Sequence, residues 1–388
     1  MNSVSTIDIL FSLLSFSVLG KKLPEEIKIE ITEDRLCDLY KLSKKHDLAN
    51  IVGGALAENG ITFKDNEFYN KFISEQLGSF LRDETQNFEC GRISALFEEN
   101  GIEFVLLKGS VIRKYYPETW MRSKSDIDIL IKKESIDKAK ELLTGKLGYV
   151  SGPPSTHDVP FYSPSKVLFE LHFELNESDF RVVDSLSTPW EYAHLAELKK
   201  FEYVLNEDYF IFYHIVHMAK HFSIGGCGIK PFLDLYLFDK VLKYDKSAVE
   251  KLCIECGLGK FFFEMLELSE VWFGGAEHSE LTLLLQEYLL SGGVFGNRSN
   301  RIAVARTKVG GKKKFILSRI FLSLEDLRKN CRDKNITVWN YPYYTVKRWF
   351  NLFKKEKFAS VANELSTLDA ISDEETTNVD KILKGLGL

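Results

Sequence analysis

The stretch K-S-D-I-D-I-L-I at residues 124–131 decides how the centre of the chain folds. Its isoleucines and leucine are typical of a buried strand, yet Asp126 and Asp128 stand in it one residue apart. Side chains of a strand alternate between its two faces, so the two aspartates share one face and the three isoleucines share the other. Neighbouring carboxylates repel each other, and burying each one costs several kcal/mol unless a partner compensates it. The strand therefore predicts a compensating cation on its acidic face.

Strand and helix patterns alternate around this stretch, over residues 101–178. Short apolar or alternating runs predict strands, whereas apolar residues at spacings of three and four predict helices. In chain order the predicted elements are a strand, a helix, a strand, a helix and two strands: I-E-F-V-L-L (102–107), V-I-R-K-Y-Y (111–116), D-I-D-I-L-I (126–131), E-S-I-D-K-A-K-E-L-L (134–143, ending near Gly145), P-F-Y-S-P (160–164, an edge strand) and V-L-F-E-L-H-F-E-L (167–175). This order is typical of a mixed sheet covered by helices.

Helical patterns precede and follow the predicted sheet. In residues 1–100 we predict an amphipathic helix that ends at Gly20, a helix over F-I-S-E-Q-L-G-S-F-L (72–81), and another over about 84–99 that ends at Asn100-Gly101. The pattern is helical again from about residue 186. The predicted class is therefore α+β, a small mixed sheet flanked by helical regions, with four parts: an N-terminal helical region (1–100), a core (101–185), a C-terminal helical region (186–360) and a loosely attached acidic tail (361–388).

Composition describes an ordinary soluble globular chain. Of its 388 residues 45% are hydrophobic and 28% charged, and the apolar run near the N-terminus is too short to cross a bilayer and lacks a preceding positive charge. We therefore expect no membrane segment. The six scattered cysteines are expected to be free thiols in a reducing cytoplasm. The close pair C-I-E-C (253–256) lacks a second pair at zinc-site spacing, so two thiols on a packed helix are favoured over a metal site.

Charge is distributed unevenly along the chain. Residues 298–357 contain 17 Lys and Arg and four acids, a net charge of +13, while the whole chain has −5 and the remainder therefore −18. Such an asymmetry is found on surfaces that bind RNA or another polyanion, and also on the solvated faces of ordinary helices. The run K-V-G-G-K-K-K (308–314) is predicted to be a flexible basic loop and is the best candidate in this segment for a phosphate contact.

Further polar residues are expected to join the two aspartates. Lys108-Gly109-Ser110 stands where the first strand ends and a helix begins, and a helix N-terminus with glycine and serine can receive a phosphate. On the last strand Glu170, His172 and Glu174 share one face. Three acids beside a phosphate cradle are the parts needed for phosphoryl transfer with one or two Mg²⁺ (or Mn²⁺) ions and a nucleoside triphosphate.

The combination L-K-G-S, S-D-I-D-I-L-I and F-E-L-H resembles the nucleotidyltransferase superfamily of the DNA polymerase β type. More narrowly, the chain is similar to a bacterial group of uncharacterised nucleotidyltransferases. That similarity includes Y-Y-P, Arg122, H-M-A-K-H, F-L-D-L and Y-P-Y-Y-T-V-K-R-W, and so spans most of the chain. The 15 residues 111–125 between Ser110 and Asp126 are somewhat more than the superfamily usually has.

The resemblance implies a role for each matching residue. Gly109 and Ser110 would contact the triphosphate of an NTP such as ATP, and Asp126 and Asp128 would bind both metal ions. Glu170 would hold the metal ion on the side of the attacking group and help to activate the acceptor hydroxyl. Glu174, nearer the end of the strand, is the alternative third metal ligand.

Several other residues have two open interpretations. Lys108 and Arg122 neutralise triphosphate charge or form ion pairs with neighbouring acids. His172 positions substrate, or assists as a base, or is a hydrogen-bonded structural residue. His214, His217 and His221 lie along one stripe of a predicted helix, where a metal site is less favoured than a contact of one of them with the active site or with a carboxylate such as Asp234.

Two classes of function follow. The first is an enzyme that transfers a nucleoside monophosphate from an NTP to an acceptor, most simply a small-molecule hydroxyl, or an RNA end or protein side chain as in toxin-type relatives. The second is a non-catalytic nucleotide-binding regulatory protein of the same fold, which the intact acids disfavour. For either aspartate, replacement by asparagine is expected to abolish transfer with little loss of stability.

Overall fold

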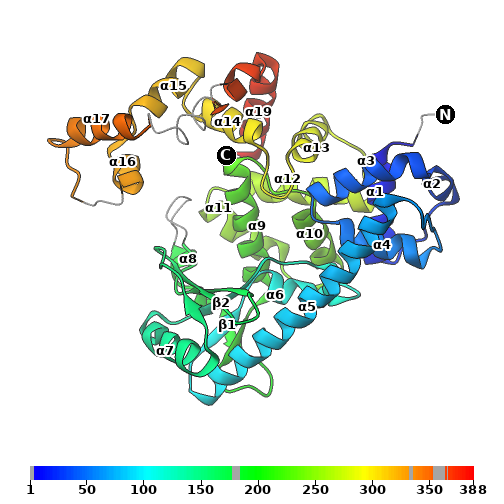
Figure 1. Ribbon diagram of the computed structural model, residues 1–388, viewed down its shortest axis with the longest axis horizontal. Helices are drawn as coiled ribbons and strands as arrows, with labels where there is room; N and C mark the ends of the chain where they lie inside the picture. The colour runs from blue at the N-terminus through cyan, green and yellow to red at the C-terminus, as the bar shows by residue number, and fades with distance from the viewer. Residues whose placement is uncertain (1–3, 177–183, 332–334, 353–362, 365) are drawn as a thin grey trace. The chain divides into compact units, whose positions relative to one another are not determined.

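The computed structural model describes residues 4–176, 184–331, 335–352, 363–364 and 366–388 (Figure 1). The chain forms two compact units. The first contains residues 1–220 and 229–282 together with Gly387, and the second contains 221–228 and 283–386 together with Leu388. The predicted acids and the Lys108-Gly109-Ser110 turn belong to the first unit, whereas His221 and the basic run 308–314 belong to the second, and the two units are described separately.

A seven-stranded mixed sheet forms the centre of the first unit. The strands are β1 (Phe104–Leu106), β2 (Asp126–Ile131), β3 (Val150–Ser151), β4 (Asp158–Tyr162), β5 (Leu168–His172), β6 (Ala193–Leu195) and β7 (Glu202–Leu205). Their order across the sheet is β3-β4-β5-β2-β1-β7-β6. Strand β2 is parallel to β5 and antiparallel to β1, which in turn is parallel to β7. The predicted α+β class with a small mixed sheet is confirmed.

One face of this sheet is packed against two helices, α5 (Glu67–Glu99) and α7 (Ile136–Leu147), which lie beside the strands in Figure 1. The apolar face of β2 is fully buried there. A single core contains side chains from strands β2 and β5 and from helices α5 and α7: Ile127, Ile129, Ile131, Phe169, Leu171, Ile93, Phe97, Ala139 and Leu143. Because the pleat alternates, the carboxylates of β2 and β5 lie on the opposite face, as the sequence predicts.

The structure corrects three of the predicted elements. The two helices expected over 72–81 and 84–99 are one continuous helix, α5, because no proline or helix-ending glycine interrupts the pattern. Strand β4 is not an edge strand, since it pairs with β3 as well as β5. Strands β6 and β7 lie in the region expected to be helical, and three or four residues are too few to show a two-residue alternation.

The segment between β1 and β2 also differs from the prediction. A regular helix was expected over 111–116, but the structure has a four-residue helix α6 (Gly109–Ile112), followed by the 3₁₀ turns η1 (Arg113–Tyr115) and η2 (Thr119–Met121). Residues 116–125 therefore cross from the sheet to the surrounding helices before β2 begins. This path brings the segment into contact with helices far away in the sequence.

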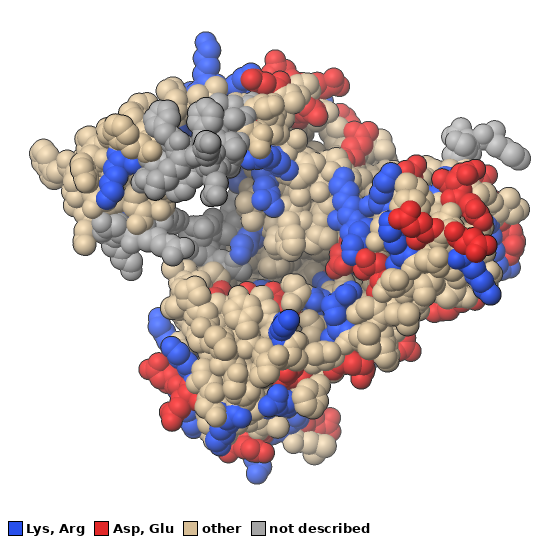
Figure 2. Space-filling view, in the orientation of Figure 1, with Lys and Arg blue, Asp and Glu red and all other residues tan. Residues whose placement is uncertain are grey.

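The N-terminal helices are α1 (Thr6–Leu19), α2 (Glu25–Glu30), α3 (Glu33–Lys45) and α4 (Ala49–Glu58). Helix α1 begins at a capping box formed by Ser5 and Asp8 and ends, as predicted, at Gly20, which has a φ of 65°. On the face shown in Figure 2, basic and acidic side chains are interspersed over these helices. This face of the N-terminal helices therefore has no large surface of one charge.

The rest of the first unit is helical. It contains α8 (Asp184–Ser187), the 3₁₀ turn η4 (Pro189–Tyr192), most of α9 (Glu207–Ile224), α10 (Lys230–Val241), α11 (Lys246–Glu255), α12 (Gly259–Ser269) and η5 (Glu270–Gly274). Cys253 and Cys256 are buried at the end of α11 and are not in a disulfide, and no group of possible metal ligands in the described ranges includes them. Among the residues described, no helix is both long and apolar enough to cross a membrane.

The second unit contains most of α13 (Glu280–Gly292), then α14 (Arg298–Lys308), α15 (Lys312–Ile320), α16 (Leu324–Cys331), α17 (Tyr341–Leu352) and α19 (Asp373–Leu386). The predicted basic loop 308–314 is shorter than expected, because its three consecutive lysines begin α15. The last segment is not a loosely attached tail. Residues 373–386 form an amphipathic helix with four buried apolar side chains (Val379, Ile382, Leu383 and Leu386), which packs against α14.

Several basic side chains of the +13 segment already have partners within the second unit. Arg306, Lys312 and Arg319 form ion pairs with Asp373, Asp369 and Glu364. Residues 332–334 and 353–362 of this segment lie outside the described residues. A polyanion contact through 298–357 therefore stays a prediction, and these ion pairs reduce the net positive charge available for it.

Candidate active site

The three predicted acids lie on one face of the sheet, on the adjacent strands β2 and β5. In the parallel register Asp128 is directly opposite Glu170, and Asp126 is opposite Leu168, one pleat repeat earlier. The acids differ in depth, because Asp128 is only 3% exposed whereas the Glu170 side chain is 27% exposed. Asp126 is half-buried. The arrangement is a row of carboxylates that begins inside the protein and reaches the surface.

Asp128 is the best compensated of the three. Its Oδ1 accepts a hydrogen bond from Lys108 Nζ at 2.9 Å and lies 2.8 Å from His172 Nε2. Burial by itself would raise the pKa of Asp128, but Lys108 and His172 outweigh it and hold this pKa well below the usual value. Burial likewise opposes the charged form of Lys108, and Asp128 reverses that effect and raises its pKa.

Asp126 has no such compensation. Within the described part of the chain, no lysine, arginine or histidine lies within ion-pair distance of its carboxylate. Burial, and then the charges of Asp128 and Glu170, raise the pKa of Asp126 to about 6. The compensation predicted from the sequence is therefore uneven, because Lys108 and His172 contact Asp128 directly, whereas Lys108 acts on Asp126 only from beyond ion-pair distance.

His172 joins the two strands on this face. Its Nε2 also lies 3.5 Å from Glu170 Oε2, and its buried ring stacks on His157 with ring centres 6.0 Å apart. Burial would lower the pKa of His172, but the bonds to Asp128 and Glu170 raise it overall. The ligand atoms of Asp128, Glu170 and His172 all lie within 4.8 Å of one another.

Two groups of possible metal ligands occur in the described ranges. Besides the group of Asp128, Glu170 and His172, a second one joins His172 with His157 and Asp158. Glu174 belongs to neither group, because it follows the end of β5, where its half-exposed carboxylate pairs with Lys133 at 3.2 Å. The structure therefore brings Glu170, and not its alternative, beside Asp128.

The turn between β1 and α6 has an unusual backbone. Lys108 has φ 46° and ψ −128°, a conformation that residues with a Cβ atom rarely adopt and that costs roughly 1–3 kcal/mol. The amide of Ser110 already donates to Leu107 O at 3.2 Å, and α6 is a single helical turn. The helix dipole expected at Ser110 is therefore small, and positive charge at this turn comes from lysine side chains.

One of these lysines was not predicted as a site residue, although it begins the stretch that defines the fold. Lys124 Nζ donates to Ser110 Oγ at 3.0 Å. Burial, together with the nearby Arg113, lowers the pKa of Lys124 to about 8. Lys124 is 14 residues from Ser110 in the sequence, and this spacing does not predict a contact. The two residues meet because the segment between them follows an irregular path.

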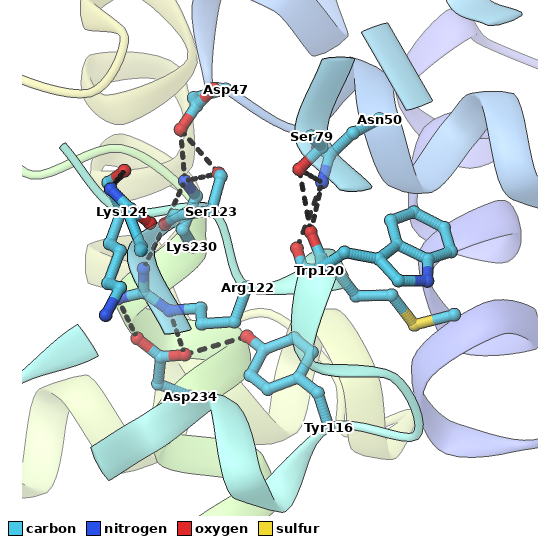
Figure 3. A network of polar contacts seen from close by, with 12 residues as sticks. Asp47, Asn50, Ser79, Tyr116, Trp120, Arg122, Ser123, Lys124, Lys230 and Asp234 are labelled. Atoms are coloured by element: carbon cyan, nitrogen blue, oxygen red, sulfur yellow. Dashed lines mark hydrogen bonds and ion pairs between the residues drawn. The ribbon is translucent and has the colours of Figure 1, made fainter. Parts of the chain in front are cut away.

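Arg122 lies in a buried polar network that joins the segment before β2 to helix α10 (Figure 3). Its Nε and Nη2 donate to the two carboxylate oxygens of Asp234, both at 2.7 Å, and Tyr116 Oη donates to Asp234 Oδ1 at 2.7 Å. Asp234 is completely buried. Burial would lower the pKa of Arg122, but Asp234 raises it. The contacts of Arg122 are thus with a distant acid, and they do not support the predicted contact with triphosphate.

The same network continues toward the N-terminal helices. Lys230, at the start of α10, donates to Asp47 and to Ser123 Oγ, while Asn50 of α4 donates to the carbonyl of Trp120 at 3.1 Å (Figure 3). These contacts hold the backbone of residues 116–124 from two sides. Since that segment leads directly into β2, the network positions the strand with the two aspartates.

Helix α9 faces the acids from the first unit's helical part. Tyr213 is buried, and burial raises the pKa of its phenol, with Lys108, Asp128 and Glu170 as its charged neighbours. Lys220 has Lys108, Glu170 and Asp158 as charged neighbours. His214 bonds the carbonyl of Pro231 at 3.1 Å rather than the carboxylate of Asp234, and neither group of possible metal ligands includes the three histidines of α9.

A cavity of about 180 Å³ adjoins the turn at Ser110. It lies where β7 diverges from β1, and side chains of α6 and α9 complete its wall. Lys114, Tyr115, Glu202 and Phe210 are among its lining residues.

Comparison with known proteins adds one informative match. The family model described as "Uncharacterised nucleotidyltransferase" matches residues 33–274, which is more than half of the chain. Among solved structures, the antibiotic-resistance factor ANT(2'')-Ia is similar at 15% sequence identity and a TM-score of 0.27, over 50% of this chain and 91% of that chain. A likeness at this TM-score does not establish a shared fold. No curated protein matches the chain.

Proposed function

Because the chain belongs to the family of uncharacterised nucleotidyltransferases, we propose that it transfers a nucleoside monophosphate from an NTP to the hydroxyl of a small-molecule acceptor. Family membership supports nucleotidyl transfer as the class of reaction. The observation that supports the residue assignment is the register of β2 and β5, in which Asp128 and Glu170 are direct neighbours and Asp126 shares their face. Three acids on one face of a mixed sheet suit phosphoryl transfer with divalent cations.

Asp128 and Glu170, whose ligand atoms lie within 4.8 Å of each other, would hold one Mg²⁺ or Mn²⁺ ion, and Asp126 on the same face would join it or bind a second ion. Carboxylate oxygens are the ligands these ions prefer, and Asp126, Asp128 and Glu170 provide them on one side of the sheet. Asp126 is a half-buried carboxylate with no cation at ion-pair distance among the described residues, as expected for a group whose partner is a bound ion. A bound divalent ion would neutralise phosphate charge and lower the pKa of an acceptor hydroxyl.

The chain's own residues have separate tasks in this proposal. Lys108 and the Gly109-Ser110 turn bind the triphosphate, and Asp126 and Asp128 hold the metal ions. Glu170, whose side chain is 27% exposed, accepts the proton of the acceptor hydroxyl. The buried His172 positions Glu170 and Asp128 through Nε2 and so contributes to substrate binding indirectly. Arg122 fixes the segment before β2.

The bond changes follow from these positions. The acceptor oxygen forms a bond to the α-phosphorus, the bond from that phosphorus to the bridging oxygen breaks, and pyrophosphate leaves with the electron pair. The proton of the hydroxyl passes to the carboxylate of Glu170. No covalent intermediate on the protein is needed. Positioning by these residues would account for the catalysis, together with charge compensation by Lys108 and by the divalent ions that the acids would hold.

The proposal is tested by incubating the protein with each of the four NTPs, Mg²⁺ or Mn²⁺ and a panel of hydroxyl acceptors, with release of pyrophosphate as the readout. We expect metal-dependent release with at least one NTP, and loss of release in Asp126→Asn. Transfer to RNA or to a protein instead of a small molecule would indicate a toxin-type activity. NTP binding without pyrophosphate release under any of these conditions would contradict the proposal in favour of a regulatory role.

A further inference from the structure

Lys124 crosses directly over the turn that begins α6. A Cβ atom added to Gly109 would lie 3.0 Å from Lys124 Cβ and 3.5 Å from its Cδ, so the lysine stem packs on the glycine. Its ammonium group reaches Ser110 Oγ at 3.0 Å. The backbone of Lys124 is held as well, because its carbonyl accepts a hydrogen bond from Gln86 Nε2 of α5 at 3.2 Å. The position of this ammonium group is therefore defined by packing and hydrogen bonds.

Lys124 differs from the other cations around the turn because it forms no ion pair with a carboxylate of the described residues. Lys108 pairs with Asp128 at 2.9 Å and Arg113 pairs with Asp83 at 2.5 Å. For Lys124, no carboxylate lies within ion-pair distance anywhere in the described ranges. A largely buried ammonium group without an anion is unfavourable. A hydroxyl such as that of Ser110 is a neutral partner and does not compensate this charge.

Ser110 and its surroundings suit an anion that comes from outside the chain. The turn provides the half-buried hydroxyl of Ser110 and two ammonium groups, those of Lys108 and Lys124, around the buried Gly109. The single turn of α6 provides little dipole, so the lysines would supply the charge that a longer helix supplies in other phosphate sites. The cavity that Ser110 lines leaves space beside the Ser110 hydroxyl.

We propose that Lys124, together with Ser110, binds the triphosphate tail of the NTP and compensates the charge of the departing pyrophosphate. This inference rests on the proposed nucleotidyl transfer. It assigns to Lys124 the phosphate contact that the sequence suggested for Arg122. In the absence of NTP, Ser110 Oγ holds the ammonium group in place, and phosphate oxygens replace or join that contact when NTP binds.

The test measures binding of inorganic tripolyphosphate and of adenosine by calorimetry, with EDTA present to exclude divalent ions. Lys124→Met keeps the length of the stem and removes the charge, and it is expected to weaken tripolyphosphate binding roughly tenfold or more, as for a lost hydrogen bond to a charged group. Lys124→Arg is expected to retain part of the affinity. Lys133→Met removes an exposed lysine outside the site and is the matched control, with unchanged binding expected.

The outcomes separate the inference from the proposed function. Wild-type affinity for tripolyphosphate in Lys124→Met would overturn the inference and leave nucleotidyl transfer standing, whereas a wild-type chain that binds neither tripolyphosphate in EDTA nor any NTP in the presence of Mg²⁺ or Mn²⁺ would overturn both. Lys124→Gln is the second variant, because it keeps a polar side chain near Ser110 and removes the charge. A loss of tripolyphosphate affinity in Lys124→Gln, with adenosine binding unchanged, supports the inference even if Lys124→Met fails to fold.

Discussion

Replacing the two aspartates of β2 by asparagine is expected to change stability in opposite directions. In the metal-free protein Asp126 has a raised pKa of about 6 against an ordinary value of 3.8. The native state therefore binds its proton more tightly than the unfolded state does, and the free energy of unfolding falls as pH rises from about 4 to about 6. A shift of about two units corresponds to about 3 kcal/mol lost at neutral pH, as an upper bound.

Asp126→Asn removes this cost and is expected to raise the free energy of unfolding by about 1–3 kcal/mol at pH 7.5, since the amide still has to be desolvated. Asp128→Asn is expected to lower it by about 3–5 kcal/mol, because Lys108 and His172 lose the acid that they share. Sequence analysis predicted little loss of stability for either variant. For Asp128 the structure favours the opposite outcome, because both Lys108 and His172 bond to its carboxylate.

The assay is urea unfolding in EDTA between pH 4.5 and pH 7.5, followed by tryptophan fluorescence, with each variant compared with the wild type at the same pH. Comparing differences removes the contribution of the other titrating groups. The stabilisation by Asp126→Asn should grow as pH rises through the window and level off above pH 7. A pH-independent difference, or a destabilised Asp126→Asn, would refute the reasoning about its missing partner.

Three further predictions follow. Glu170→Gln should reduce the rate of transfer by at least about 100-fold with little change in NTP affinity, whereas Glu174→Gln should leave the rate close to wild type. Steady-state kinetics measures both variants. The reverse result would identify Glu174 as the third metal ligand. Asp234→Asn should lower the free energy of unfolding by about 3–5 kcal/mol, because it leaves the buried Arg122 guanidinium without its carboxylate partner. If urea unfolding gave the same free energy for this variant as for the wild type, the buried ion pair would be refuted. Mg²⁺ should raise the thermal midpoint of the wild type more than that of Asp126→Asn, as followed by calorimetry, and equal shifts would argue against Asp126 as a ligand.

The sequence by itself determined the face of the sheet on which the acids lie. In D-I-D-I-L-I and V-L-F-E-L-H-F-E-L the alternation placed Asp126, Asp128 and Glu170 opposite the apolar residues that pack against α5 and α7. It also predicted the mixed sheet and the end of α1 at Gly20. These properties depend on neighbouring residues in one strand or helix, where backbone geometry fixes the direction of every side chain.

Tertiary structure decided which charge has which partner. Arg122 pairs with Asp234, 112 residues later, and Lys124 reaches Ser110 through an irregular segment, so neither contact followed from spacing along the chain. Likewise, Asp126 and Asp128 are equivalent in the sequence pattern. Of these two aspartates, only Asp128 is bonded to Lys108 and His172. The direction of a side chain is set locally by the backbone, whereas its solvation and its ion pairs are set by residues that folding brings from elsewhere in the chain.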